Sequence, residues 1–202
     1  MKITIPKLDI SNDLKIYRDF KKKDKDWSSK LDILIPCAGN ATRMGKINKP
    51  KALHKIGKQS SLKLLLKFLL PISAHFYIAI NNKTDEEKIY IQEISEEGLL
   101  DKITFVKSIP GTGDGMAVLD TLNHIQPAES DSKAMVIWGD MVIKNPEFIF
   151  FCNYLSQSYF DKESFFIPLC FKENPYVFFE RDKNKNIVTT RFNVRDEFIN
   201  KG

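Results

Sequence analysis

The feature that most constrains the fold is an apolar run that ends in a turn of small residues and is followed by cations. The run reads Ile33-Leu34-Ile35-Pro36-Cys37-Ala38-Gly39-Asn40-Ala41-Thr42-Arg43-Met44, and Pro50-Lys51-Ala52-Leu53 comes soon after it. Backbone that wraps closely around phosphates needs Gly and Ala, because larger side chains hold the ligand away. Residues 33–84 also contain nine Lys and Arg residues and no carboxylate. The pattern therefore predicts a buried strand that leads into a loop for a polyanionic ligand.

Composition describes one ordinary globular domain with a short extension. The chain has 202 residues, of which 43% are hydrophobic and 28% are charged, with a net charge of +5. No apolar stretch approaches the ~20 residues of a membrane span, and the three separated cysteines form no disulfide or metal pattern. We therefore expect a cytoplasmic protein that does not bind a membrane. The basic run at 21–25 favours a solvated linker over nucleic-acid binding.

Alternating apolar strands and amphipathic helices predict the fold class. Residues 1–30 are expected to form an N-terminal extension, and the domain is expected at 31–202. The predicted strands are 31–37, 75–80, 103–106, 134–138, 165–171, 176–181 and 187–194. This order predicts an α/β fold with a mainly parallel, Rossmann-like sheet, flanked by helices and followed by a β-rich C-terminal part.

Capping residues and helical spacing predict four helices between the strands. Ser60 or Ser61 is expected to cap the first, which Pro71 ends. A capping box at 84–87 is expected to start the second, which would run to about Glu97. The third follows the turn at 110–115, and the fourth starts at Asn145-Pro146-Glu147. The apolar residues at helical spacing in these last two are Met116, Leu119, Leu122 and Ile125, then Phe148, Phe151, Cys152 and Leu155.

Three polar or glycine-rich segments follow three of the predicted strands. They are the Gly39 loop, the Gly111 turn and Asp140. Because ligands bind at the carboxyl ends of strands in open parallel sheets, these segments are expected to lie together at one edge.

Two common phosphate-binding motifs do not fit the loop. The segment 39–46 reads G-N-A-T-R-M-G-K, which has one residue too many for a P-loop, and Ile47 stands where a Ser or Thr would hold magnesium. A dinucleotide fingerprint would need two further glycines and an acid about 20 residues on.

The chain resembles the sugar-phosphate nucleotidyltransferases of GT-A type fold. Their first strand ends in A-G-x-G-T-R-M followed by P-K, and the segments 38–44 and 50–51 are similar to it, with Ala41 in place of the second Gly. Gly111-Thr112-Gly113 with Met116 resembles their G-T-G/A-x-x-M turn, and Trp138-Gly139-Asp140 resembles their aromatic-Gly-Asp. Residues 176–189 are more weakly similar to the hairpin of this family, and residues 199–202 are more weakly similar to its I-N-T-G segment. The resemblance is closest to the N-acetylglucosamine-1-phosphate uridylyltransferases and covers about 31–202.

The resemblance implies a function and a role for each matched residue. It implies Mg²⁺-dependent transfer of a nucleotidyl group from a nucleoside triphosphate to a phosphorylated acceptor, a sugar 1-phosphate, with release of pyrophosphate. Arg43 and Lys51 would be the catalytic cations, Asp140 would hold magnesium, and Asn200 would contact the substrate. The nucleotide would be bound by Ala38, Gly39, Asn40, Ala41, Thr42, Gly111 and Thr112.

Other interpretations stay open at this point. The family's second metal ligand follows the I-N-T-G segment and has no assigned counterpart here, which leaves room for an incomplete domain or a non-catalytic relative that binds a nucleotide or a partner. A transferase of cytidylyl or guanylyl groups to a non-sugar phosphate is a further alternative. The Phe-rich stretch 148–179 predicts packing in the core and sheet, and any exposed part of it is a candidate surface for a homo-oligomer.

Overall fold

The computed structural model describes residues 15–16, 18–19, 31–39, 49–83, 85–95, 98–125, 133–143, 145–159, 177–183 and 187–192. The chain divides into two compact units, Met1–Ser164 and Phe165–Gly202, and each is described by itself. The predicted strand at 165–171, the loop residues 40–48 and Asn200 lie outside the described residues. Of the predicted extension at 1–30, the structure describes only 15–16 and 18–19, which are helical.

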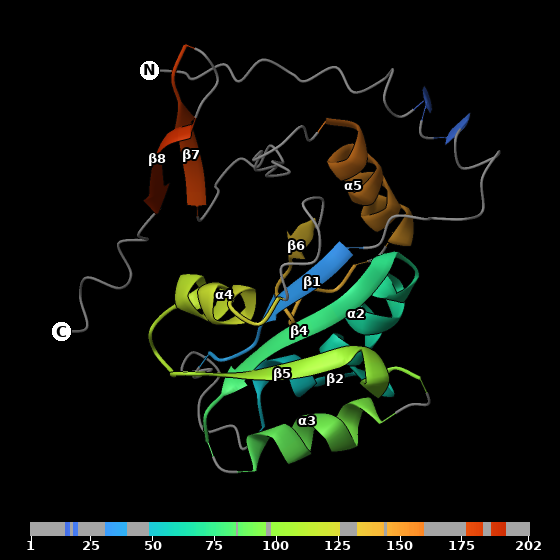
Figure 1. Cartoon of the computed structure of the whole chain (residues 1–202), viewed down its shortest axis with the longest axis vertical. Helices are drawn as coiled ribbons and strands as arrows, with labels where there is room; N and C mark the ends of the chain where they lie inside the picture. Colours follow the sequence, from blue (N-terminus) through green and yellow to red (C-terminus); the bar gives the residue numbers. More distant parts are fainter. Residues whose placement is uncertain are drawn as a thin grey trace. The chain divides into compact units, whose positions relative to one another are not determined.

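A parallel sheet of four strands forms the centre of the first unit (Figure 1). The strands are β1 (Leu31–Pro36), β4 (Ser73–Asn81), β5 (Ile103–Ser108) and β6 (Ala134–Val136), and their order is β5-β4-β1-β6. Each neighbouring pair is parallel, so all four strands point the same way. β1 pairs with β4 on one side and β6 on the other. Helices cover both faces of the sheet at β1, which explains why its sequence is a nearly continuous apolar run. The predicted parallel α/β sheet is confirmed.

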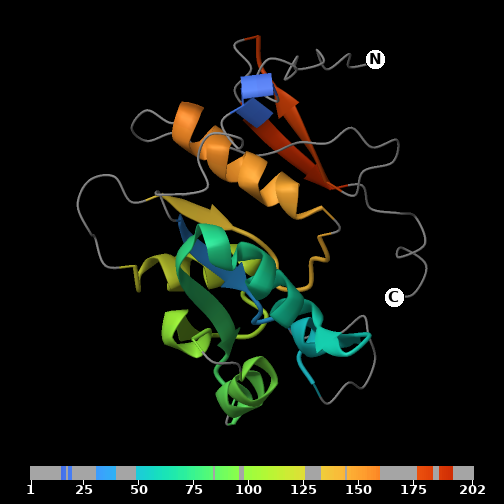
Figure 2. The same ribbon diagram turned by 90° about the vertical axis from the view of Figure 1, so that its right-hand side faces the viewer.

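Short elements connect the sheet to its helices. A small antiparallel hairpin, β2 (Lys55–Ile56) and β3 (Gln59–Ser60), leads directly into α2 (Ser61–Leu69), as Figure 2 shows. Ser60 caps α2 by accepting a hydrogen bond from the Lys63 backbone N–H, which confirms the predicted start. The remaining short elements are the 3-10 turns η2 (Lys51–Leu53), η3 (Leu70–Ile72) and η4 (Leu100–Lys102).

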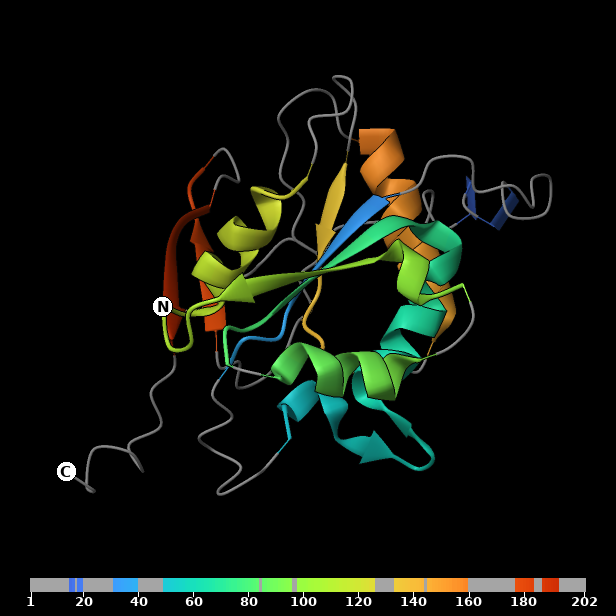
Figure 3. The same cartoon turned by 60° about the horizontal axis from the view of Figure 1, so that its bottom comes forward.

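The two faces of the sheet are covered unequally (Figure 3). α2, α3 (Glu86–Ile94) and α5 (Pro146–Tyr159) pack on one face, and α4 (Asp114–Leu122) packs on the other. The first face carries the main core, in which Ile33 and Ile35 share a cluster with the buried side chains of Leu62, Tyr90 and Ile149. Among the described helices, none is both long and apolar enough to cross a membrane; the longest, α5, has 14 residues.

α3 differs in one respect from the helix predicted there, since it ends at Ile94, before the predicted end near Glu97. It begins at Glu86 after Asp85, which has a φ of 66° and makes no side-chain capping bond. Thr84, the first residue of the predicted capping box, lies outside the described residues. By contrast, the Asn145 side chain accepts a hydrogen bond from the Glu147 backbone N–H at 2.9 Å, as predicted for the start of α5.

α4 contacts the sheet through small residues and leaves its larger ones in solvent. Ala117 packs against Ala38 and Ala79, which lets the helix come close to β1 and β4. The predicted apolar positions Met116 and Leu119 are 45% and 51% exposed. Helical spacing therefore identified the helix but not the side that packs.

The second unit contains an antiparallel hairpin. Its strands are β7 (Val177–Arg181) and β8 (Ile187–Phe192), paired from Val177 with Phe192 to Arg181 with Ile187. This agrees with the two strands predicted at the end of the chain and with the expectation of β structure there.

Candidate functional site

The strand order changes direction at β1. The chain passes from β1 to β4 and β5 on one side of β1, then crosses to β6 on the other side. In open parallel sheets, ligands bind at such a switch of direction, outside the carboxyl ends of the two strands. Gly39 follows β1, Asp140 follows β6, and Gly111 follows β5. The prediction that these three segments share one sheet edge is confirmed.

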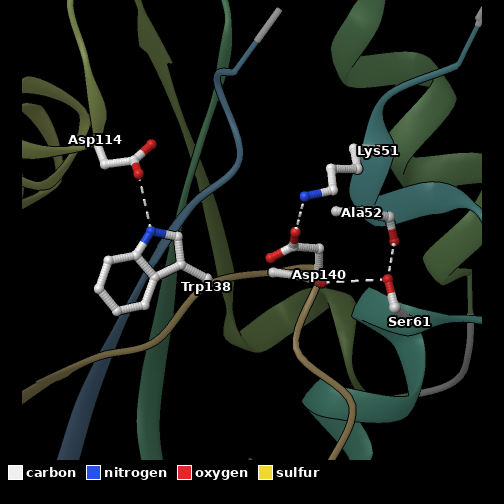
Figure 4. A network of polar contacts seen from close by, with 7 residues as sticks. Lys51, Ala52, Ser61, Asp114, Trp138 and Asp140 are labelled. Atoms are coloured by element: carbon white, nitrogen blue, oxygen red, sulfur yellow. Dashed lines mark hydrogen bonds and ion pairs between the residues drawn. The ribbon is translucent and has the colours of Figure 1, made fainter. Parts of the chain in front are cut away.

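An ion pair between Lys51 and Asp140 lies at this edge (Figure 4). The Lys51 ammonium contacts the Asp140 carboxylate, and the two side chains are 54% and 33% exposed. Lys51 opens η2, whose next two residues, Ala52 and Leu53, are buried and hold the turn in the core. Sequence reasoning named both charged residues, and the structure brings them into direct contact.

Ser61 ties together the two backbone segments that carry the ion pair. Its hydroxyl donates to the Ala52 carbonyl at 2.9 Å and also faces the Gly139 carbonyl at 3.4 Å. Ala52 is next to Lys51, and Gly139 is next to Asp140, so one buried side chain sets the spacing of both turns. The sequence presented Ser61 only as an alternative helix cap, and nothing local marks it as a bridge to residues 78 positions away.

Gly139 lies where no side chain fits. A Cβ built on Gly139 would be 2.2 Å from the Cys37 Sγ, 3.2 Å from Ile35 Cγ2 and 3.3 Å from Ala52 Cβ. The glycine therefore allows the turn before Asp140 to lie directly on the end of β1 and on η2.

Replacing Gly139 with alanine is expected to destabilise the protein by about 1–3 kcal/mol, because the added methyl overfills a packed site. Chemical denaturation measures the change. Gly115→Ala is the matched control, since its Cβ would meet nothing within 4 Å on α4, and it is expected to gain about 0.4–1 kcal/mol. A combined Cys37→Ala/Gly139→Ala variant should recover much of the loss. Equal stability of Gly139→Ala and the parent would contradict the packing described here.

A pocket of about 320 Å³ lies at the carboxyl ends of β1 and β5, beside the start of α4. It is lined by Ala38, Gly39, Ile109, Gly111, Gly113, Asp114 and Ala117. Gly111 and Gly113 have φ values of 86° and 92°, a conformation that favours glycine, and they bend the chain from β5 into α4. The Thr112 hydroxyl donates to the Ile109 carbonyl at 2.8 Å, so this side chain stabilises the turn itself.

Asp114 and Trp138 connect the pocket to the ion pair. The Trp138 indole N–H donates to the Asp114 carboxylate at 3.0 Å, and the ring is 46% exposed. Three consecutive residues therefore have three roles: Trp138 holds the pocket carboxylate, Gly139 packs against Cys37, and Asp140 pairs with Lys51 (Figure 4). Asp114 was missed from the sequence, where its only signal is a carboxylate directly after the glycine turn.

A polar cluster lies buried beneath the strand ends. The Asn81 backbone N–H and side-chain amide both donate to the Glu86 carboxylate, each at 3.4 Å, and burial raises the pKa of Glu86 despite these bonds. Burial also raises the pKa of the Cys37 thiol to about 12. The thiol is therefore protonated at neutral pH, and Cys37 does not supply a thiolate nucleophile there.

Six of the predicted site residues are described by the structure. Ala38, Gly39 and Gly111 line the pocket, Lys51 and Asp140 form the ion pair, and Thr112 stabilises the glycine turn. Asn40, Ala41, Thr42, Arg43 and Asn200 lie outside the described residues, and their roles stay predictions. No cluster of three His, Cys, Asp or Glu side chains occurs within the part of the chain that the structure describes.

The donor chemistry of Asp140 suits a magnesium ion that the substrate helps to bind. Mg²⁺ is usually held by one or two carboxylates, with phosphate and water oxygens completing six ligands. Asp140 offers one partly exposed carboxylate at the carboxyl end of β6, beside a lysine suited to phosphate. The residues present therefore fit Mg²⁺ bound together with a nucleotide.

Comparison of the chain with models of known protein families and with curated proteins gave no match. A function therefore has to be argued from the residues and their geometry.

Proposed function

We propose that this chain is a Mg²⁺-dependent nucleotidyltransferase that joins a nucleoside triphosphate to a sugar 1-phosphate and releases pyrophosphate. The observation that carries the proposal is the Lys51–Asp140 ion pair at the switch point of a parallel sheet, next to a pocket lined by Gly39 and Gly111. The resemblance of the three motif segments to such transferases agrees with this arrangement.

The opposite charges at the site match the two parts of a magnesium–nucleotide complex. Lys51 is a compact cation that can neutralise a phosphate, and Asp140 is a hard oxygen ligand that can hold Mg²⁺. In the absence of substrate the two side chains neutralise each other. When bound, the metal supplies charge neutralisation on the phosphates.

The reaction requires positioning more than acid–base chemistry. An anionic phosphate oxygen of the sugar 1-phosphate attacks the α-phosphorus in line; the new O–P bond forms as the bond from that phosphorus to the bridging oxygen of the β-phosphate breaks. Pyrophosphate leaves with the bonding electron pair, and no proton has to move. Lys51 would neutralise charge on the α-phosphate and the acceptor phosphate. Arg43 would serve the β- and γ-phosphates, as the resemblance implies.

The experiment is a thermal-shift screen of five nucleoside triphosphates, each with and without Mg²⁺, followed by pyrophosphate-release assays with sugar phosphates. A ligand at ~100 times its Kd stabilises the native state by ~2.7 kcal/mol, which raises the Tm visibly. We expect a shift that needs both nucleotide and metal, and pyrophosphate release that needs a sugar phosphate.

Each other outcome leads to a different conclusion. Nucleotide binding without pyrophosphate release, whichever acceptor is added, would support a non-catalytic nucleotide-binding protein. Release with a phosphorylated acceptor that is not a sugar would keep the transferase and replace its acceptor class. The absence of any shift and any turnover would overturn the proposal.

A further inference from the structure

We infer that Asp114 selects the nucleobase and that the nucleotide this site prefers carries guanine, an inference that rests on the proposed function. The observation is a carboxylate on the wall of the 320 Å³ pocket, held in place by an indole N–H. The step from this carboxylate to guanine follows from its position, its charge and its hydrogen-bonding capacity.

The distribution of charge orients a bound nucleotide. Asp114 places a negative charge at the pocket, and Lys51 places a positive charge on the other side of the Trp138-Gly139-Asp140 segment (Figure 4). A triphosphate is repelled by the first, whereas the Lys51–Asp140 pair offers an ammonium group to phosphate oxygens and a carboxylate to Mg²⁺. The phosphates therefore belong beside Lys51 and Asp140, and the base belongs in the pocket with Asp114.

The remainder of the pocket suits a flat base. Its other walls are the apolar side chains of Ala38, Ile109 and Ala117 and the side-chain-free backbone of the glycine turn. A Cβ at Gly39 or Gly113 would meet no atom within 4 Å, so the space in front of these glycines is open. These walls contribute shape and apolar contact, and among the described residues that line this pocket Asp114 is the one with a charged side chain.

The hydrogen-bonding capacity of Asp114 is defined by Trp138. The indole N–H occupies one acceptor position on Oδ2 at 3.0 Å and restrains the carboxylate. Each oxygen of an ionised carboxylate has two acceptor positions and the group donates nothing. Both oxygens can therefore still accept a hydrogen bond from a ligand edge that offers two adjacent N–H donors.

Among the four common bases, guanine alone has that edge. Its N1–H and its 2-amino group are adjacent donors and match a carboxylate in a bidentate pair. Cytosine and adenine each present one amino donor next to a ring-nitrogen acceptor, which would face the second carboxylate oxygen. Uracil presents one N–H between two carbonyl acceptors. A carboxylate thus favours guanine and opposes the other three.

The test compares nucleotide binding by the full chain and by Asp114→Asn, with GTP, ITP, XTP, UTP, CTP and ATP titrated at fixed Mg²⁺. Binding is followed by thermal shift, and base preference is checked by pyrophosphate release. We expect the parent to bind GTP about 10- to 100-fold more tightly than the others, with ITP weakened because it lacks the 2-amino donor.

Asp114→Asn should exchange the preference rather than abolish binding. The asparagine amide can donate to the 2-carbonyl of xanthine while its oxygen accepts N1–H, so XTP should gain about as much affinity as GTP loses. Trp138→Phe removes the N–H that positions the carboxylate. This variant should bind GTP a few-fold more weakly than the parent, and its affinity for XTP should not rise. Asp101→Asn, an exposed carboxylate in η4 ahead of β5, is the matched control and should leave the preference unchanged.

The failure of this inference is distinguishable from failure of the proposed function. Turnover with UTP or another triphosphate in preference to GTP, or unchanged preferences in Asp114→Asn, would overturn the role of Asp114 and leave the transferase intact. Absence of binding by every triphosphate would overturn both. If Asp114→Asn unfolds, Trp138→Phe and the ITP comparison with the parent decide the question.

Discussion

Replacing Lys51 with alanine is expected to lower the rate of pyrophosphate release by about 10²–10³-fold while the protein stays folded. The loss follows because a cation aimed at developing charge acts in the transition state, and removing one such contact has effects of this size. Stability should hardly change, because the Lys51–Asp140 pair is partly exposed and such pairs contribute only about 0–1 kcal/mol. Steady-state rates at saturating nucleotide, with a melting curve of each variant, measure both quantities.

Controls separate the role of Lys51 from a general effect of charge. Lys55→Ala removes the same charge from an exposed lysine on β2 and should keep nearly full activity. Lys51→Arg keeps the charge but changes its shape, and we expect a rate between those of the parent and the alanine variant. A Lys51→Ala variant that turns over within a few-fold of the parent would rule out the mechanism proposed for this site.

The fold could be predicted from the sequence largely because β1 and its neighbours are apolar on both faces. The apolar run from Leu31 to Pro36 predicts a central parallel strand even when the strands that pair with it are unknown. For α4, the sequence predicted the helix but not the side that packs on the sheet. Its larger apolar side chains suggest a packing face, but the residues that the helix buries are Ala117 and Thr121, and the close approach that requires such small side chains is a property of the assembled sheet. The left-handed conformation of Asp85 before α3 could not be predicted either, because the capping pattern does not reveal it.

In the candidate site, too, the sequence identified individual residues but not the contacts between them. Asp140 follows a predicted strand, and ligands bind at strand ends in open parallel sheets. Lys51 matches the P-K of the family that the chain resembles, so both residues could be named individually. Their contact could not be foreseen, since it depends on Ser61 and Gly139 bringing two distant turns together. Asp114 was missed because a carboxylate at the start of a helix has an ordinary explanation in the helix dipole; only the pocket and the Trp138 bond single it out.

The ion pair also has a consequence for how ligands bind. Because Lys51 and Asp140 satisfy each other, metal alone must displace a lysine, and nucleotide alone must displace a carboxylate. A magnesium–nucleotide complex engages both side chains at once and exchanges one ion pair for two favourable contacts. The pair should therefore couple the two ligands, so that each raises the affinity for the other.

Asp140→Asn is expected to raise the Mg²⁺ concentration for half-maximal rate by about 10- to 100-fold, the loss in metal affinity seen even when a supporting residue is removed. The same variant frees Lys51, so metal-free nucleotide should bind at least as tightly as to the parent. Lys51→Ala should do the reverse and bind Mg²⁺ more tightly in the absence of nucleotide. Thermal-shift titrations of each variant with metal alone and nucleotide alone measure these opposite changes.

Asp85→Asn breaks a comparable exposed pair with Lys88 and should alter neither titration. An unchanged magnesium requirement in Asp140→Asn would remove this carboxylate from the metal site, whereas opposite shifts in the two variants would establish that the ion pair is exchanged for the metal–nucleotide complex.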